Sequence, residues 1–236
     1  MVSDLLERES KNHDMPRVRR LTKANYVYHV LNRGAKRGLL FANASDYRAF
    51  EELLGEATKR VPIRILAYCL MPNHWHLLLW PLQDGDLSRY VKWLTTTHAC
   101  RWARNRECIG NGAVYQSRFK SIPIEKGPHL LWAWRYVERN ALRAELVSRA
   151  EDWEWSSLRR RMNTPTDQWL DNGPVPLPPN WAEIVNVPQT KAEIEQFRKR
   201  VKEGKPFGRN EWLPDGDTLR GRPNLRKTKK EGLTPI

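Results

Sequence analysis

Two apolar runs separated by only three residues constrain the fold of this chain most strongly. The first run, IRILAYCL, spans residues 63–70, and the second, HWHLLLW, spans residues 74–80. Both runs have the length of a strand and are bounded by a proline-containing segment, which is typical of β-structure. Because the linker Met-Pro-Asn is so short, the two strands must run antiparallel. The sequence therefore predicts a buried hairpin and, with it, an antiparallel sheet.

Further elements are predicted on both sides of this hairpin. YVYHVLNRG (26–34) alternates β-branched and aromatic residues and ends at Gly34, which indicates a strand, and residues 113–125 indicate another. Residues 46–61, 86–105 and 129–147 carry apolar side chains at helical spacing. The order β-α-β-β-α-β-α predicts an α+β fold, with a ferredoxin-like antiparallel sheet and helices on one of its faces.

Composition divides the chain into three parts. Residues 1–24 form a polar and then basic lead-in, residues 25–162 the domain, and residues 163–236 a Pro-rich and then basic extension. A short helix is predicted at 191–204, and the rest of the extension is predicted to be largely irregular. Its last basic stretch has too few large apolar residues to order itself, so the tail is expected to be disordered.

The charge balance points to a polyanionic partner. The chain has 41 Lys and Arg against 27 Asp and Glu, a formal net charge of +14, and such a surplus attracts nucleic acid or an anionic membrane. No apolar run approaches the ~18 residues that a membrane span needs. The N-terminus is too polar for a signal peptide, and three distant cysteines argue against a disulfide framework. We expect a cytoplasmic protein with no membrane partner.

Two pairs of polar residues are candidates for chemistry. His74 and His76 share one face of the predicted strand because side chains alternate, and imidazoles roughly 6–7 Å apart can share one cation. Tyr136 and Asn140 lie one helical turn apart and share a face of their helix. The residues alone also allow a plainer interpretation, in which one histidine is buried in the core, the other is solvated, and Tyr136 and Asn140 only pack.

Five blocks of sequence and two C-terminal segments carry a family resemblance. The blocks are YHVLNRG (28–34), LMPNHWHLLLWP (70–81), YQSRFKSIPIE (115–125), RYVERNALRAELV (135–147) and DWEWSSL (152–158), and the segments are GKPFGRNEW (204–212) and RGRP (220–223). Together they resemble the REP-associated tyrosine transposases, which are single-tyrosine transposases of the His-hydrophobic-His endonuclease superfamily. The resemblance implies a nucleoid-associated enzyme that acts on single-stranded DNA carrying palindromic hairpins.

The resemblance also implies roles for the candidate residues. His74 and His76 would bind a divalent cation, Mg²⁺ or Mn²⁺, with Asn140 as third ligand where insertion-sequence relatives have Gln. Tyr136 would attack the DNA, giving a 5′-phosphotyrosine and a free 3′-OH. Ala141 stands where the family usually has Pro.

Basic residues near these motifs are the candidates for binding DNA phosphates. RGRP is similar to basic hooks that enter the A·T minor groove, although a solvated tail explains it equally well. The basic candidates are Arg17, Arg19, Arg20, Arg33, Arg118, Lys120, Arg220 and Arg222.

Three matters stay open from the sequence. A metal phosphodiesterase that uses water, with Tyr136 structural, is one alternative function. A DNA-binding regulator without catalysis is another. The sequence also leaves open whether the chain acts alone or as a homodimer in which Tyr136 serves the partner's metal.

Overall fold

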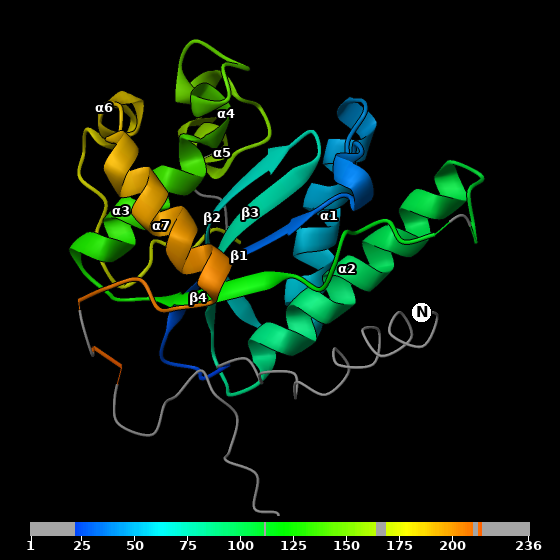
Figure 1. Ribbon diagram of the computed structural model, residues 1–236, viewed down its shortest axis with the longest axis horizontal. Coiled ribbons are helices and arrows are strands. Elements are labelled where there is room, and N and C mark those ends of the chain that lie inside the picture. Colours follow the sequence, from blue (N-terminus) through cyan, green and yellow to red (C-terminus); the bar gives the residue numbers. More distant parts are fainter. Residues whose placement is uncertain (1–21, 111, 164–168, 210–211, 214–236) are drawn as a thin grey trace, which may run out of the picture. The chain divides into compact units, whose positions relative to one another are not determined.

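A four-stranded antiparallel sheet forms the centre of the structure, a computed structural model that describes residues 22–110, 112–163, 169–209 and 212–213 (Figure 1). The strand order is β2-β3-β1-β4, and β2 and β3 form the predicted hairpin, so the α+β class is confirmed. No helix in these ranges is long and apolar enough to cross a membrane. The strands are β1 (Val27–Arg33), β2 (Ile63–Met71), β3 (His74–Pro81) and β4 (Lys120–Ile124). The helices are η1 (Ala35–Arg37), α1 (Ala44–Arg60), α2 (Asp86–Asn105), α3 (Pro128–Glu138), α4 (Asn140–Arg143), η2 (Ala150–Asp152), α5 (Ser157–Asn163), α6 (Trp181–Asn186) and α7 (Lys191–Glu203).

Helices cover both faces of the sheet, so the prediction that they lie on one face is wrong (Figure 1). On the first face α1 and α2 bury Phe50 and Tyr90 against the strands. On the second face α3, α6 and α7 bury Trp134, Trp181 and Phe197. The reason lies in β2, where every residue from 65 to 71 is buried. A strand that is covered on both faces has a continuous apolar run instead of an alternation.

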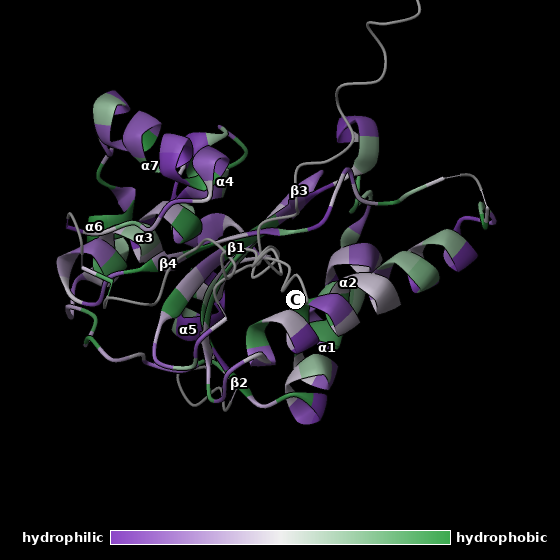
Figure 2. Cartoon of the chain, turned by 60° about the horizontal axis from the view of Figure 1, so that its bottom comes forward, coloured by the Kyte–Doolittle hydropathy of each residue, from purple (hydrophilic) through white to green (hydrophobic). Residues whose placement is uncertain are grey.

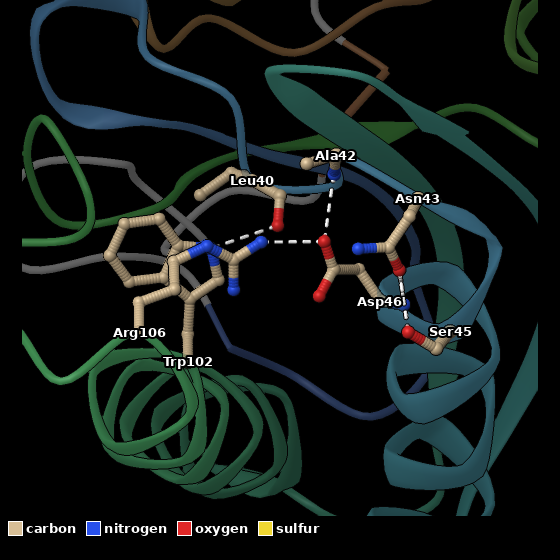
Figure 3. Close-up of polar contacts among 7 residues, drawn as sticks. All are labelled: Leu40, Ala42, Asn43, Ser45, Asp46, Trp102 and Arg106. Atoms are coloured by element: carbon tan, nitrogen blue, oxygen red, sulfur yellow. Dashed lines mark hydrogen bonds and ion pairs between the residues drawn. The ribbon is translucent and has the colours of Figure 1, made fainter.

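Polar contacts hold the start of α1 against the end of α2 (Figure 3). The Asp46 carboxylate accepts a hydrogen bond from Arg106 at 2.5 Å, and the Trp102 indole donates to the Leu40 carbonyl at 2.9 Å. The Leu40 amide in turn donates to the Pro72 carbonyl at 2.8 Å. Since Pro72 lies in the hairpin turn, these contacts fix the backbone immediately before β3.

The strand predicted at 113–125 forms only over β4. Residues 113–119 leave the ladder, apart from a single bridge between Gly34 and Tyr115. The Tyr115 hydroxyl is buried against the first face, where it lies 2.7 Å from His98 Nδ1 and accepts from the Trp75 indole at 3.2 Å. Because this ring is drawn into the core, the chain between Tyr115 and β4 bulges away from β1.

The helix predicted at 129–147 is shorter and interrupted. α3 ends at Glu138, Arg139 has φ −80° and ψ 0°, and α4 then continues for one turn to Arg143. The Arg143 amide still donates to the Arg139 carbonyl at 2.8 Å, so the helical path continues across the junction. Tyr136 and Asn140 consequently remain about one turn apart, as predicted.

The chain beyond residue 162 packs on the second face. The compact unit runs from residue 22 to 214, past the end that composition assigns to the domain. α7 matches the helix predicted at 191–204, and α6 was not predicted. Much of the described extension is irregular, as predicted, but four spaced apolar residues, Trp181, Val185, Phe197 and Phe207, join the core of the second face. The basic tail lies outside the described residues.

Irregular segments pair with both edges of the sheet. At the β4 edge, the Phe207 amide donates to the Pro123 carbonyl and the Phe207 carbonyl accepts from the Glu125 amide, each at 2.9 Å. At the β2 edge, the Asp171 amide donates to the Ile65 carbonyl at 2.8 Å. The Leu70 amide, further along β2, donates to Trp155 at 2.9 Å. Both outer strands therefore have neighbours that belong to the same chain.

Candidate active site

A cavity of about 580 Å³ lies on the second face, where β1 ends opposite the start of β3. Its walls come from β1, β3, the bulge before β4, the α3–α4 junction and α7. It is lined by His29, Leu31, Asn32, Arg33, Met71, His74, His76, Gln116, Ser117, Arg118, Lys120, Tyr136, Asn140, Arg143, Ala144, Arg198, Val201 and Lys202.

The histidine pair predicted from the sequence lies together in this cavity. The ring centroids of His74 and His76 are 5.1 Å apart, with an interplanar angle of 81°. Burial, followed by the charges of Arg33 and Arg143, lowers the pKa of His74 to about 4. Burial, followed by the neighbouring histidines and the same two arginines, holds the pKa of His76 well below its usual range. Both imidazoles are therefore neutral at pH 7, the form that binds a metal ion.

The hydrogen bond to Asn73 fixes which nitrogen of His74 is free. Nδ1 of His74 lies 2.7 Å from Oδ1 of Asn73, and the Asn73 amide nitrogen donates to the Arg37 carbonyl at 3.3 Å. Because Oδ1 can only accept, Nδ1 of His74 must carry the hydrogen. Nε2 of His74 is left with its lone pair free to bind a ligand.

His29 is a site residue that the sequence analysis did not identify. Its Nε2 lies 2.8 Å from Nδ1 of His76, and the two rings are stacked with centroids 5.1 Å apart. Burial and then Arg143 lower the pKa of His29 to about 3. The available signal was the alternation of YHVLNRG, which places His29 on the same face as Leu31, the residue paired with His76. Without the strand order this alternation could not be connected to the histidine pair.

Tyr136 reaches the same cavity from α3 and is only 5% exposed. Its ring centroid lies 5.9 Å from that of His76, with the rings edge to face. Trp132 stacks on it at 5.6 Å and Phe197 contacts it at 4.6 Å. The guanidinium of Arg143 lies over the ring at 4.1 Å. These contacts hold the phenol beside the histidines.

Asn140 lies in the cavity at 6% exposure, with its side chain held by Arg143. Oδ1 of Asn140 accepts a hydrogen bond from Arg143 at 2.9 Å, while Nδ2 is buried and has no partner among the described residues. One lone pair of the oxygen remains available. Its role as third metal ligand stays a prediction.

All the charged side chains that line the cavity are basic. Of the predicted DNA-binding residues, Arg33, Arg118 and Lys120 lie here, and the bulge before β4 carries Arg118 to this position. Arg17, Arg19, Arg20, Arg220 and Arg222 lie outside the described residues. The sequence analysis missed Arg143, Arg198 and Lys202. Helical spacing from Asn140 could have indicated Arg143, whereas only the docking of α7 brings in the other two.

The donor set of the cavity fits a divalent cation that takes further ligands from its substrate. His74 offers a free Nε2, His76 is neutral, and Asn140 supplies an amide oxygen. Within the described ranges, no three His, Cys, Asp or Glu side chains are grouped to hold a metal ion. A cation bound here would therefore have open positions for phosphate oxygens, as in catalytic metal sites.

The chain is similar to known transposases over about half of its length. The family model described as "Transposase IS200 like" matches residues 22–140. A REP-associated tyrosine transposase of Haemophilus influenzae is 26% identical over 125 residues, which cover 49% of this chain and 71% of that protein. A REP-associated tyrosine transposase solved with a REP hairpin is 21% identical, covering 67% of this chain and 92% of that one, with a TM-score of 0.49. A transposase structure from Deinococcus radiodurans is 15% identical, covering 51% and 84%, with a TM-score of 0.37.

Proposed function

Since this chain belongs to the IS200-like transposase family, we propose that it cuts and rejoins single-stranded DNA with Tyr136 as the nucleophile. One observation supports this most directly. Tyr136 and the neutral histidine pair line the same cavity, and every charged side chain around them is basic. Such a cavity attracts a phosphodiester and presents a hydroxyl to it.

The proposed reaction exchanges one phosphate ester for another. The phenolic oxygen of Tyr136 forms a bond to phosphorus while the bond from phosphorus to the 3′ oxygen of the preceding nucleotide breaks. The phenol gives up its proton to solvent, and the departing oxygen takes one up. The products are a 5′-phosphotyrosine and a free 3′-OH. Because the ester bond is preserved, a second 3′-OH can attack it and release Tyr136 again.

The histidines would hold a divalent cation, Mg²⁺ or Mn²⁺, next to this phosphate. When bound, the cation supplies charge neutralisation for the phosphate oxygens. Two imidazole nitrogens suit Mn²⁺ better than Mg²⁺, which prefers oxygen ligands.

The protein's own side chains supply orientation and further positive charge. Trp132 and Phe197 fix the plane of the Tyr136 ring, which leaves its oxygen a narrow range of directions. The Arg143 guanidinium, held by its contacts with Asn140 and the Tyr136 carbonyl, is a fixed positive charge in the cavity. Preorganised charge of this kind stabilises the negative charge that develops during phosphoryl transfer.

The proposed substrate is single-stranded DNA with a palindromic hairpin of the REP type. The name of the Haemophilus relative supports this choice, as do the basic side chains of the cavity. Phosphate contacts alone do not read sequence, so the hairpin sequence and the cleavage position must come from contacts elsewhere.

A denaturing gel tests the proposal. Purified protein is mixed with labelled single-stranded hairpin DNA and either Mn²⁺ or EDTA. We expect a slow-migrating covalent species that requires Mn²⁺ and is absent with Tyr136→Phe. Fragments that persist in Tyr136→Phe would identify water as the nucleophile. Binding of several hairpins without cutting would identify a DNA-binding regulator.

A further inference from the structure

Helix α7 lies outside the family match, which ends at residue 140, and yet forms one wall of the cavity. It begins at a capping box between Thr190 and Glu193, and it ends at Gly204, which has a φ of +69°. Phe207 then pairs with the edge of β4. The two ends of α7 are thus defined by local structure, and its position is set by contact with the sheet.

Phe197 fixes the rotation of α7 about its own axis. This side chain is completely buried, with its ring centroid 4.6 Å from that of Tyr136, 5.1 Å from that of His29 and 5.0 Å from that of Trp132. It is the one buried residue of a helix that Figure 2 shows as mostly hydrophilic. With Phe197 directed into the core, three residues on the adjoining face of α7, Arg198, Val201 and Lys202, line the cavity.

Arg198 and Lys202 carry two positive charges to the cavity. They lie four residues apart, so they share one face of α7, and both line the cavity although both are exposed. Within the described part of the chain, neither forms an ion pair. Lys199, the neighbour of Arg198 in sequence, is equally exposed but does not line the cavity.

The walls of the cavity that come from β1, β4 and the bulge before β4 are also basic. Arg33 comes from β1, and Arg118 and Lys120 come from the bulge and the start of β4. The buried Nε of Arg33 has no hydrogen-bond acceptor among the described residues. A buried donor without a partner is costly, and a phosphate oxygen is an acceptor that would satisfy it. The cavity that holds Tyr136 is therefore lined by cations both from α7 and from the sheet.

We propose that α7 is a DNA-binding wall of the active site, in which Arg198 and Lys202 bind the backbone phosphates flanking the one that Tyr136 attacks. This proposal deepens the proposed function and rests on it. The DNA strand that Tyr136 cleaves would pass between α7 and the cavity wall formed by β1 and β4. The C-terminal extension, through α7, would then contact the DNA each time a strand is cleaved. Since the contacts are to phosphates, they position the DNA strand but do not recognise its base sequence.

Matched charge reversals on one helix test this proposal. Arg198→Glu and Lys202→Glu are compared with Lys199→Glu, which changes the net charge by the same amount on another face. Each is made in a Tyr136→Phe background, and binding of a fluorescent single-stranded hairpin is measured by anisotropy in EDTA at several salt concentrations. All three positions are exposed, and thermal unfolding of each variant verifies that the fold is unchanged.

We expect Arg198→Glu and Lys202→Glu each to weaken binding by about tenfold or more and to lower the slope of log affinity against log salt by about 0.7. Lys199→Glu should stay within about twofold of the parent. If Lys199→Glu weakens binding as much as Arg198→Glu, only the overall charge matters and the proposal is overturned. Unchanged binding in all three variants overturns it as well.

Failure of the proposed function has a different signature. If no covalent species forms in Mn²⁺ with any hairpin, Tyr136 is not the nucleophile. The anisotropy comparison still decides the role of α7 in that case, because it uses neither metal nor cleavage.

Discussion

Replacing His29 by leucine tests how the cavity prepares His76 for a metal ion. For Nε2 of His76 to offer a lone pair, its Nδ1 must carry the hydrogen and donate it to Nε2 of His29, 2.8 Å away. Burial lowers the pKa of both rings far enough that neither takes a second proton near pH 7. If His76 binds a metal ion in this way, His29 is the acceptor that selects its ligand-ready tautomer, a common role for residues behind metal ligands, and the Nδ1–H of His29 is then a buried donor without a partner among the described residues.

The expected loss of Mn²⁺ affinity follows from the cost of leaving a buried donor without an acceptor. In His29→Leu the Nδ1 of His76 loses its acceptor within a buried site, and keeping a hydrogen there costs about 1–3 kcal/mol. In the metal-free variant, the His76 ring avoids this cost by carrying its hydrogen on Nε2 instead of Nδ1. Metal binding at Nε2 must then move the hydrogen back to Nδ1. At 1.4 kcal/mol per tenfold, Mn²⁺ affinity should fall by about 5- to 150-fold.

Calorimetric titration of the DNA-free protein with Mn²⁺ measures this directly. His74→Ala serves as the positive control, because it removes a proposed ligand. His98→Leu serves as the matched control, because His98 is also buried but lies outside the cavity. If His29→Leu binds Mn²⁺ within twofold of the parent while His74→Ala does not, then His29 only packs and the tautomer argument is refuted.

Three further predictions follow from the structure. Burial lowers the pKa of His98 to about 4, so the unfolded chain takes up this proton first as the pH falls, and His98 should contribute about 3 kcal/mol to the stability lost between pH 6.5 and 4. Urea unfolding across this range should show a smaller loss in His98→Phe. Trp181→Phe removes the indole that donates to the buried carboxylate of Glu138 at 2.7 Å, and it should cost about 2 kcal/mol in the same assay; an unchanged midpoint would contradict this. Finally, EDTA should stop cleavage while leaving hairpin affinity within about threefold, because the six basic side chains of the cavity remain; a gel-shift titration would show any larger loss.

Local patterns in the sequence were sufficient for the parts of the site that lie close together along the chain. The hairpin was predictable because IRILAYCL and HWHLLLW are joined by three residues, and strand alternation placed His74 and His76 on one face. Helical spacing did the same for Tyr136 and Asn140, even though α3 ends between them. In each case the relevant distance is set by the geometry of one element or one short turn.

The parts that escaped prediction depend on contacts between distant segments. His29 belongs to the site only because β1 pairs with β3, and nothing in YHVLNRG indicates that pairing. Arg198 and Lys202 reach the cavity because Phe197 packs on the second face of the sheet.

The segments that flank the sheet have a consequence for assembly. Phe207 pairs with the edge of β4, while Asp171 and Trp155 bond to the edge of β2. An open edge is the usual place where two sheets join into one continuous sheet across a dimer interface. Among the described residues, neither edge of this sheet is free for such a junction. A homodimer would therefore have to associate through helix surfaces, or displace the Phe207 segment and, with it, the end of the chain that holds α7 in place.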